Sequence, residues 1–355
     1  MLARTRKLMT SYPWLPESVE TSNELRIDWT TYQNIEACKR RAAIVASLKR
    51  ELAVDPWDFV AGRAVHEALD VRQKAIMMGS KAGLLGAMEH VLEAFFKPQC
   101  KACQGEGCGD CKGMGSLPLV VPVDEYRTLG RLKDVVGVYD QTFPDEPFEI
   151  LESEQAGERE LGDVDYRVMR SVETVKVWWQ FKIDGVWRNP DTGELNVKDT
   201  KTSSRDEFAD SEGGEFSKGE AKYQMSGQFM GYCWSKSAPE QPVTGAVLDQ
   251  IVIRKPVQRV TAKTPPQNEA KRRFFRWTPG QLNEWRSDVL ANIGEWLTAC
   301  AKANNEPPPM TRTNCAWPRV CPYFSSCVQP TENERMMKLA GTKYRERTWN
   351  PLTAK

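Results

Sequence analysis

The sequence Phe-Lys-Ile-Asp-Gly at residues 181–185, followed by Val-Lys-Asp-Thr-Lys-Thr at residues 197–202, decides how the chain folds. Residues 175–181 are rich in β-branched and aromatic side chains, which is typical of a strand. Residues 189–193 have the sequence Asn-Pro-Asp-Thr-Gly, which is typical of a turn. The two stretches therefore predict a β-hairpin.

This hairpin would carry one carboxylate on each arm, Asp184 and Asp199. Asp199 and Lys201 lie two residues apart, so their side chains leave the same face of the second strand. Two carboxylates beside a lysine can hold a divalent cation and a water molecule for attack on a phosphodiester. Taken alone, ordinary surface charges on an exposed hairpin explain the pattern better, because D-x-K is common.

Composition sets limits on partners and compartment. The chain has 355 residues, enough for one large domain with insertions or for two ordinary domains. Its net charge of +1 gives no overall signature of nucleic-acid binding, so any basic surface must be local. No apolar run is long enough to span a membrane, and the first residues lack the apolar core of a signal peptide. We therefore expect a cytoplasmic protein without a membrane partner.

The ten cysteines include two groups, which in a reducing compartment indicate metal binding. The first group forms two CxxC pairs around a Gly-rich tetrapeptide, and its members are Cys100, Cys103, Cys108 and Cys111. The glycines allow tight turns, and four thiolates favour tetrahedral zinc. Over these residues the chain resembles half of a DnaJ-type zinc module. We expect a zinc-binding insertion at residues 98–116, with four free thiols in a flexible loop as the alternative.

Two predicted helices carry further polar residues. Residues 58–96 predict a long helix, broken near residues 79–80, with His66 near its start. Taken alone, a histidine on a helix is more often structural than a metal ligand. Residues 223–234 predict an amphipathic helix with Gln228 and Tyr232 on one face. That face either points toward the carboxylates or simply belongs to a half-buried helix.

Residues 254–276 form the one clearly basic stretch, which includes Lys271, Arg272 and Arg273. A solvated hairpin and a path for a phosphate backbone explain it equally well. Directly after it, Thr278 and Gln281 form the capping box of a predicted helix with Pro279 at its first position. The chain contains no GxxxxGK[ST] motif and therefore no P-loop motor.

Together these pieces resemble the RecB-like branch of the PD-(D/E)XK nuclease superfamily over residues 23–330. The likeness is greatest to its iron–sulfur members, the CRISPR-associated RecB-like exonucleases and the AddB-type nuclease domain. Four family motifs, G-x-x-x-H, I-D, D-x-K-T and Q-x-x-x-Y, occur here in the family's order. Their residues in this chain are Gly62, His66, Ile183, Asp184, Asp199, Lys201, Thr202, Gln228 and Tyr232.

The resemblance implies an α/β fold with a mixed sheet, a restriction-endonuclease-like core with helical additions. The nuclease domain would span residues 23–330, between a lead-in at residues 1–22 and a polar tail at residues 331–355. In the iron–sulfur members an early cysteine and a C-terminal trio hold a 4Fe–4S cluster. The matching residues here are Cys38, Cys315, Cys321 and Cys327.

The implied function is a metal-dependent DNA nuclease, expected to be an exonuclease in DNA processing, recombination or repair. His66, Asp184 and Asp199 would hold Mg²⁺ or Mn²⁺, with the carbonyl of Thr200 as a further ligand. Lys201 would orient the water or stabilise the transition state. Gln228 and Tyr232 would position the substrate strand or support the lysine. The DNA itself would be bound by Lys271, Arg272 and Arg273.

Two alternatives belong to other classes of protein. The first is a DNA-binding or assembly protein that keeps the nuclease scaffold without catalysis. The second is a nucleic-acid-binding module whose function lies in the zinc insertion. A nuclease without its own motor would also work with a separate helicase or recombination protein. The sequence leaves open the choice between exonuclease and endonuclease, and the polarity of cleavage.

Overall fold

A computed structural model describes residues 12, 14–53, 57–80, 82–96, 127–209, 217–254, 268–303, 307–315, 320–347, 350 and 352. The predicted zinc insertion, with its four cysteines, lies outside the described residues. Helices and strands alternate along the rest of the chain, and the protein has a mixed α/β fold.

A six-stranded sheet of mixed direction forms the centre of the fold, in the order β1-β4-β5-β6-β7 with β3 paired to β4. β4 is antiparallel to β3 and β5 and parallel to β1, while β6 is parallel to β5 and antiparallel to β7. The predicted hairpin is thus confirmed as β4 and β5. The strands are β1 (Glu24–Ile27), β3 (Glu149–Val168), β4 (Ser171–Arg188), β5 (Leu195–Ser203), β6 (Val243–Val252) and β7 (Glu269–Arg276).

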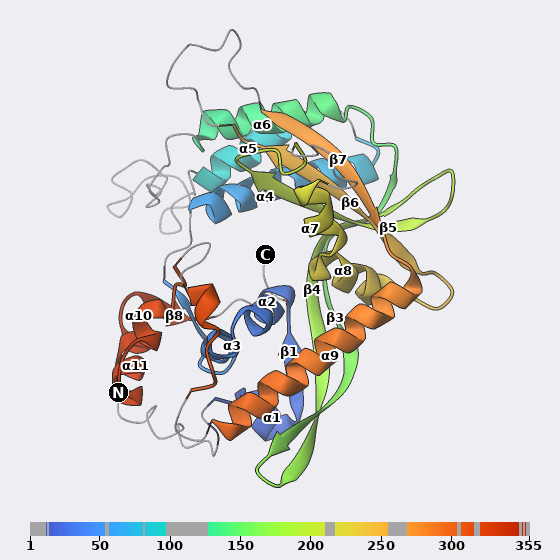
Figure 1. Cartoon of the computed structure of the whole chain (residues 1–355). Coiled ribbons are helices and arrows are strands. Elements are labelled where there is room, and N and C mark those ends of the chain that lie inside the picture. The colour runs from blue at the N-terminus through green and yellow to red at the C-terminus, as the bar shows by residue number, and fades with distance from the viewer. Residues whose placement is uncertain are drawn as a thin grey trace.

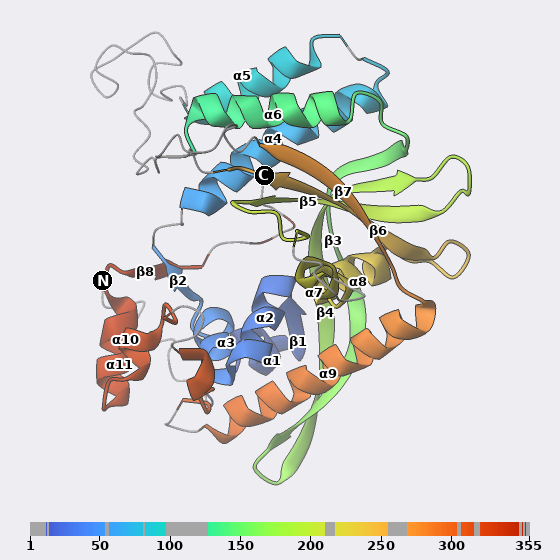
Figure 2. The ribbon, with the colours of Figure 1, turned by 45° about the horizontal axis from the view of Figure 1, so that its top comes forward.

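Helices cover both sides of this sheet. Figures 1 and 2 show α4, α5 and α6 stacked together over the β5–β7 end, while α9 runs along β3 and β4. None of the described helices is both long and apolar enough to cross a membrane. The helices are α1 (Glu17–Ser22), α2 (Trp29–Ala37), α3 (Lys39–Ala46), α4 (Trp57–Met77), α5 (Leu84–Phe96), α6 (Leu129–Thr142), α7 (Lys218–Gln224), α8 (Gly227–Lys236), α9 (Pro279–Lys302), α10 (Phe324–Cys327) and α11 (Glu332–Ala340), with a 3₁₀ helix at Arg312–Cys315.

Several helix boundaries follow from local sequence. The predicted capping box is present at the start of α9, where the Thr278 and Gln281 side chains each accept a hydrogen bond from the other's backbone amide. The long helix predicted over residues 58–96 is divided into α4 and α5 near the predicted break. The helix predicted over residues 223–234 is divided as well, into α7 and α8. At the start of α8, a Cβ at Gly227 would lie 2.4 Å from the ring of Trp29, so glycine allows this close approach.

The predictions for the two ends of the chain were wrong over the described residues. In the predicted lead-in, Trp14 and Leu15 are buried in the core, and α1 follows. In the predicted polar tail, α11 begins with a capping box, and β8 (Tyr344–Glu346) pairs antiparallel with β2 (Arg50–Leu52). The described parts of these two segments therefore belong to the packed fold.

A buried charge cluster joins α6 to the sheet. Arg272 of β7 donates hydrogen bonds of 2.7 and 2.9 Å to the two oxygens of Asp249. It also donates bonds of 2.6 and 3.1 Å to Glu146, and Tyr139 of α6 donates one of 2.6 Å to Asp249. The exposed fractions of the Arg272, Glu146 and Asp249 side chains are 8%, 2% and 0%.

Replacing Arg272 with methionine should lower the free energy of unfolding by about 3–5 kcal/mol, because two buried carboxylates lose their common partner. Urea denaturation followed by tryptophan fluorescence measures the change. Arg276→Met is the matched control, because Arg276 pairs with Glu194 on the surface, and an exposed pair contributes only about 0–1 kcal/mol. Equal losses in the two variants would contradict a structural role for Arg272.

Candidate active site

Asp184 lies where β4 and β5 move apart. Among the described residues, the two strands pair only between residues 185–188 and 195–198. Beyond this point the backbone amide of Thr200 donates a hydrogen bond of 2.7 Å to Asp184 Oδ2. The Asp184 side chain therefore fills the gap between the strands and is only 15% exposed.

His66 reaches the same carboxylate from α4. Its Nδ1 atom lies 3.1 Å from Asp184 Oδ2. A close approach of helix and strand makes this contact possible, because a Cβ at Gly62 would lie 3.2 Å from Thr202 Oγ1. Gly62 and His66 are one helical turn apart, so they share a face of α4. The G-x-x-x-H spacing therefore delivers an imidazole to the end of β5.

Asp199 is the more deeply buried carboxylate, and Lys201 is its charged partner. Lys201 Nζ lies 2.8 Å from Asp199 Oδ2, close enough for an ion pair. No other described residue donates a hydrogen bond to this oxygen. Asp199 is 3% exposed, so solvent cannot fully compensate. A buried acceptor of this kind is available to an additional positive charge.

The donor set fits a hard divalent cation. Carboxylates are the ligands that Mg²⁺ and Mn²⁺ prefer, and the adjacent imidazole of His66 would complete the set. Within the described residues, no three His, Cys, Asp or Glu side chains converge tightly enough to enclose an ion as they stand. Instead, His66 and Lys201 each neutralise one carboxylate through one contact. A bound cation would therefore displace at least one of these contacts.

The two carboxylates differ in their electrostatic surroundings. Burial favours the neutral form of Asp184, but the charge and hydrogen bond of His66 outweigh it and lower the pKa well below its usual range. Burial raises the pKa of Asp199, and the attraction of Lys201 offsets this only in part. Burial alone would lower the pKa of His66, but the adjacent Asp184 raises it overall. One carboxylate is firmly ionised, while the other takes up a proton more readily.

α8 brings Gln228 and Tyr232 to the edge of the site. Gln228 Nε2 donates a hydrogen bond of 2.7 Å to Tyr232 Oη. Burial raises the pKa of Tyr232 well above its usual value, and the charge of Asp199 adds to this. Tyr232 therefore stays a neutral phenol, and its own hydroxyl hydrogen is available to another acceptor.

Lys198 is a residue that the sequence analysis missed. Its side chain is fully buried, donates a hydrogen bond to Thr200 Oγ1 and lies 5.8 Å from the centre of the Trp187 ring. Its positive charge also helps to lower the pKa of Asp184, after the larger effect of His66. The available signal was a lysine inside a strand that otherwise reads as buried.

The three basic residues predicted to bind DNA divide between the two faces of the sheet. In the strand register, Asp199 lies beside Leu248 and then Arg273, and Lys201 lies beside Gln250 and then Lys271. Directly paired residues share a face, so Lys271 and Arg273 lie on the face of Asp199. Arg272 lies on the opposite face.

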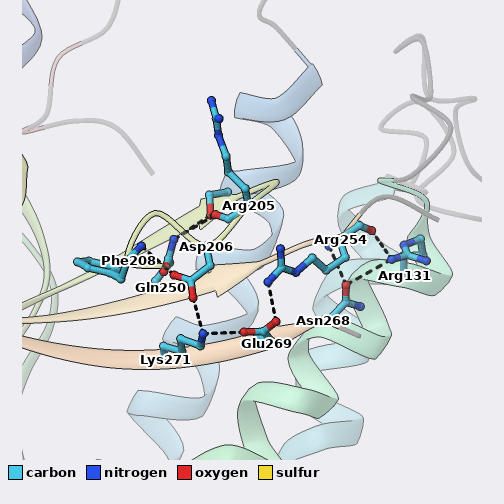
Figure 3. Close-up of polar contacts among 10 residues, drawn as sticks. Arg131, Arg205, Asp206, Phe208, Gln250, Arg254, Asn268, Glu269 and Lys271 are labelled. Carbon is cyan, nitrogen blue, oxygen red and sulfur yellow. Dashed lines mark hydrogen bonds and ion pairs between the residues drawn. The ribbon is translucent and has the colours of Figure 1, made fainter. Parts of the chain in front are cut away.

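The prediction that Arg272 binds DNA was wrong, because its guanidinium is enclosed by Asp249 and Glu146. The other two residues also have protein partners. Lys271 forms ion pairs with Glu269 at 2.8 Å and with Asp206, as Figure 3 shows. Arg273 lies 5.2 Å from the centre of the Phe208 ring.

The four cysteines with the spacing of a cluster site line one pocket, although they come from both ends of the chain. Cys38 lies between the end of α2 and the start of α3. Cys315 and Cys321 precede α10, and Cys327 is its last residue. The side chain of Asn314 ties the two parts together by donating a hydrogen bond of 2.7 Å to Ala37 O. Burial raises the pKa of the Cys327 thiol to about 11, and the nearby cysteines Cys321 and Cys38 add to this.

Comparisons with known proteins give only distant likenesses. No protein-family model and no curated protein matches the sequence. Among solved structures, the chain is similar to a candidate exonuclease from Eubacterium rectale, with 11% identity, coverage of 82% of this chain and 86% of that chain, and a TM-score of 0.39. It is also similar to the protein SSO0001, with 18% identity, coverage of 45% and 59%, and a TM-score of 0.22. Likenesses this low carry no argument about function, which therefore rests on the site itself.

The two carboxylates should contribute differently to stability. Asp184→Ala should lower the free energy of unfolding by about 1–3 kcal/mol, because the buried Thr200 amide and His66 lose their acceptor. Asp199→Ala should leave stability unchanged or raise it, because it removes a buried carboxylate that the charge of Asp184 repels. Urea denaturation in EDTA compares the two variants without metal. The reverse order of stabilities would rule out the contacts described for Asp184.

Proposed function

We propose that the chain is a metal-dependent nuclease that hydrolyses phosphodiester bonds in DNA. The observation that carries the proposal is the pair of buried carboxylates at the divergence of β4 and β5, one beside His66 and the other beside Lys201. Burial and the charge of Asp184 both disfavour ionisation of Asp199, so the two carboxylates together favour a bound cation. An anionic substrate also requires positive charge beside it, which Lys201 supplies.

His66, Asp184 and Asp199 would hold Mg²⁺ or Mn²⁺, with the Thr200 carbonyl as a further ligand. A divalent cation at such a site supplies Lewis acidity toward water and phosphate. Asp184 suits the role of permanent ligand, because its lowered pKa keeps it ionised.

The remaining side chains would act on water and substrate. Lys201 is 31% exposed and can turn from Asp199 toward solvent, where its ammonium would orient the attacking water or pair with a phosphate oxygen. Tyr232, held by Gln228, would donate its hydroxyl hydrogen to the substrate strand. Lys198 would act through Asp184, whose charge it stabilises from the opposite side of β5.

Cleavage assays test the proposal directly. Wild-type protein should degrade DNA in Mg²⁺ or Mn²⁺ and not in EDTA. Asp199→Asn and Lys201→Met should each reduce the rate by about 100-fold or more, as expected for groups that act in the transition state. Asp163→Asn is the control, because Asp163 is 62% exposed on β3 and takes no part in the site.

End-labelled linear DNA and circular DNA, followed over time, separate exonuclease from endonuclease. DNA binding without cleavage by the wild-type chain would instead favour the catalytically inactive alternative. Binding that disappears in Cys108→Ala would favour the zinc-module alternative. The absence of a P-loop motif makes a separate helicase the natural source of unwound substrate.

We also propose that the cysteine pocket holds a 4Fe–4S cluster. Four cysteines are the donor set of such clusters, and a cluster of four irons spaces its thiolates more widely than a single ion does. A cluster here would be structural, because it would join α2 and α3 to α10. The zinc insertion remains a second, separate proposal.

Protein purified without oxygen should therefore be brown and contain iron and sulfide. Cys321→Ala should lose the iron and colour and unfold more easily, because metal binding at such a site contributes to folding. Cys300→Ala is the control for iron and colour, since Cys300 is a buried cysteine that lies outside the pocket. Cys108→Ala should lose about one zinc per chain and keep the colour. Colourless wild-type protein that carries two zinc ions would exclude the cluster and leave the nuclease proposal intact.

A further inference from the structure

An exposed aromatic side chain lies on the same face of α4 as His66. Phe59 is 65% exposed. It precedes His66 by seven residues, which is close to two helical turns and roughly 10 Å along the axis. Gly62, between them, packs against Thr202 near the end of β5. Phe59 therefore lies beyond the end of β5, on the approach to the carboxylates.

A positive charge lies beyond the same end of β5. Arg205 follows Thr202 by three residues and is exposed. Its guanidinium forms no hydrogen bond or ion pair within the described part of the chain, whereas the nearby Lys271 and Arg254 are both paired. Figure 3 shows the Arg205 side chain extending away from the other labelled side chains.

The backbone of Arg205 is firmly anchored. Its carbonyl accepts hydrogen bonds of 2.6 Å from Ser203 Oγ and 3.3 Å from Gln250 Nε2. The next residue, Asp206, forms an ion pair with Lys271 and accepts a hydrogen bond of 2.9 Å from the amide of Phe208. An unpaired arginine on a fixed backbone presents its charge with little loss of backbone entropy on binding.

Phe208 completes this anchor. Its ring stacks on Tyr223 at a centroid distance of 5.7 Å, and the Arg273 guanidinium lies over it. Lys271 and Arg273 therefore have a use other than direct DNA contact, since both hold the segment that carries Arg205. Arg205, which Lys271 and Arg273 hold in place, is therefore the charge available to a phosphate.

We propose that Phe59 and Arg205 hold an unpaired DNA strand at the entrance to the site, with a base stacked on Phe59 and a neighbouring phosphate paired with Arg205. The inference rests on the proposed nuclease function and names its substrate as single-stranded DNA or a single-stranded end. Every base offers a flat face to an aromatic ring, whereas the bases of a duplex are already stacked on each other. The arrangement thus favours single-stranded over double-stranded DNA, without a preference for base sequence.

Fluorescence anisotropy with labelled oligonucleotides in Ca²⁺, chosen to limit cleavage, tests this pair. Phe59→Ala should weaken binding to single strands by roughly 5- to 100-fold, the range for loss of one stacked base, with little effect on blunt duplex. Single strands with abasic positions should bind the wild type weakly and show no further loss in Phe59→Ala. Phe59→Trp should retain affinity, and Phe59→Leu should not.

Arg205→Gln should flatten the dependence of log affinity on log salt by about 0.7, the value for one phosphate contact on a single strand. Two matched controls should behave as the wild type. Phe274→Ala removes a ring that is 57% exposed on the opposite face of β7, and Arg170→Gln removes an exposed charge at the β3–β4 turn.

Three outcomes would overturn the strand-holding pair: unchanged single-strand affinity in Phe59→Ala, equal losses for duplex and single strand, or wild-type affinity in Phe59→Leu. The last would indicate an apolar contact, such as a protein partner, in place of stacking. Cleavage by the wild type in Mn²⁺ is measured separately. A chain that cleaves DNA but shows any of these three outcomes keeps its nuclease function, and a chain that never cleaves loses that function whatever it binds.

Discussion

The backbone amide of Thr200 requires an acceptor, and this requirement joins the fold to the site. Thr200 is 1% exposed, and a buried amide without a partner would be strongly destabilising. Where β5 leaves β4, no strand offers a carbonyl, and the carboxylate of Asp184 accepts the bond instead. The same carboxylate then attracts His66 from α4. The divergence of two strands thus places a charged group between them and brings a helix to it.

Charges lie on both faces of β5, β6 and β7, and their partners differ between the two faces. On the face under α4, α5 and α6, Arg272 and Asp249 satisfy each other, and Lys198 donates to Thr200. On the other face, the charged partner of Asp199 is Lys201, whose side chain is 31% exposed. This asymmetry separates buried charges that hold the sheet together from a charge that is available for chemistry.

Local signals in the sequence predicted local structure well, because they depend on neighbouring residues. The capping box at Thr278 and the β4–β5 hairpin needed nothing beyond a few adjacent side chains. The role of Arg272 could not be predicted, because its partners Glu146 and Asp249 are distant in the sequence. The close approach of Gly227 to Trp29 likewise joins residues that are distant in the sequence.

The candidate site, too, could be predicted only in part from the sequence. Family likeness grouped His66, Asp184, Asp199 and Lys201, and the structure brings them into contact as two pairs. Their catalytic roles, like those of the cysteines, stay predictions.

The pairing of β2 with β8 has a consequence for synthesis of the chain. β2 is made well before its partner strand, Tyr344–Glu346, because the two are distant in the sequence. β1 likewise waits for residues 176–179 of β4. Both strands stay unpaired until their distant partners are made, which is a condition that favours binding to chaperones or to other nascent chains. These pairings can therefore form only after the intervening residues are available, and distant contacts of this kind slow folding.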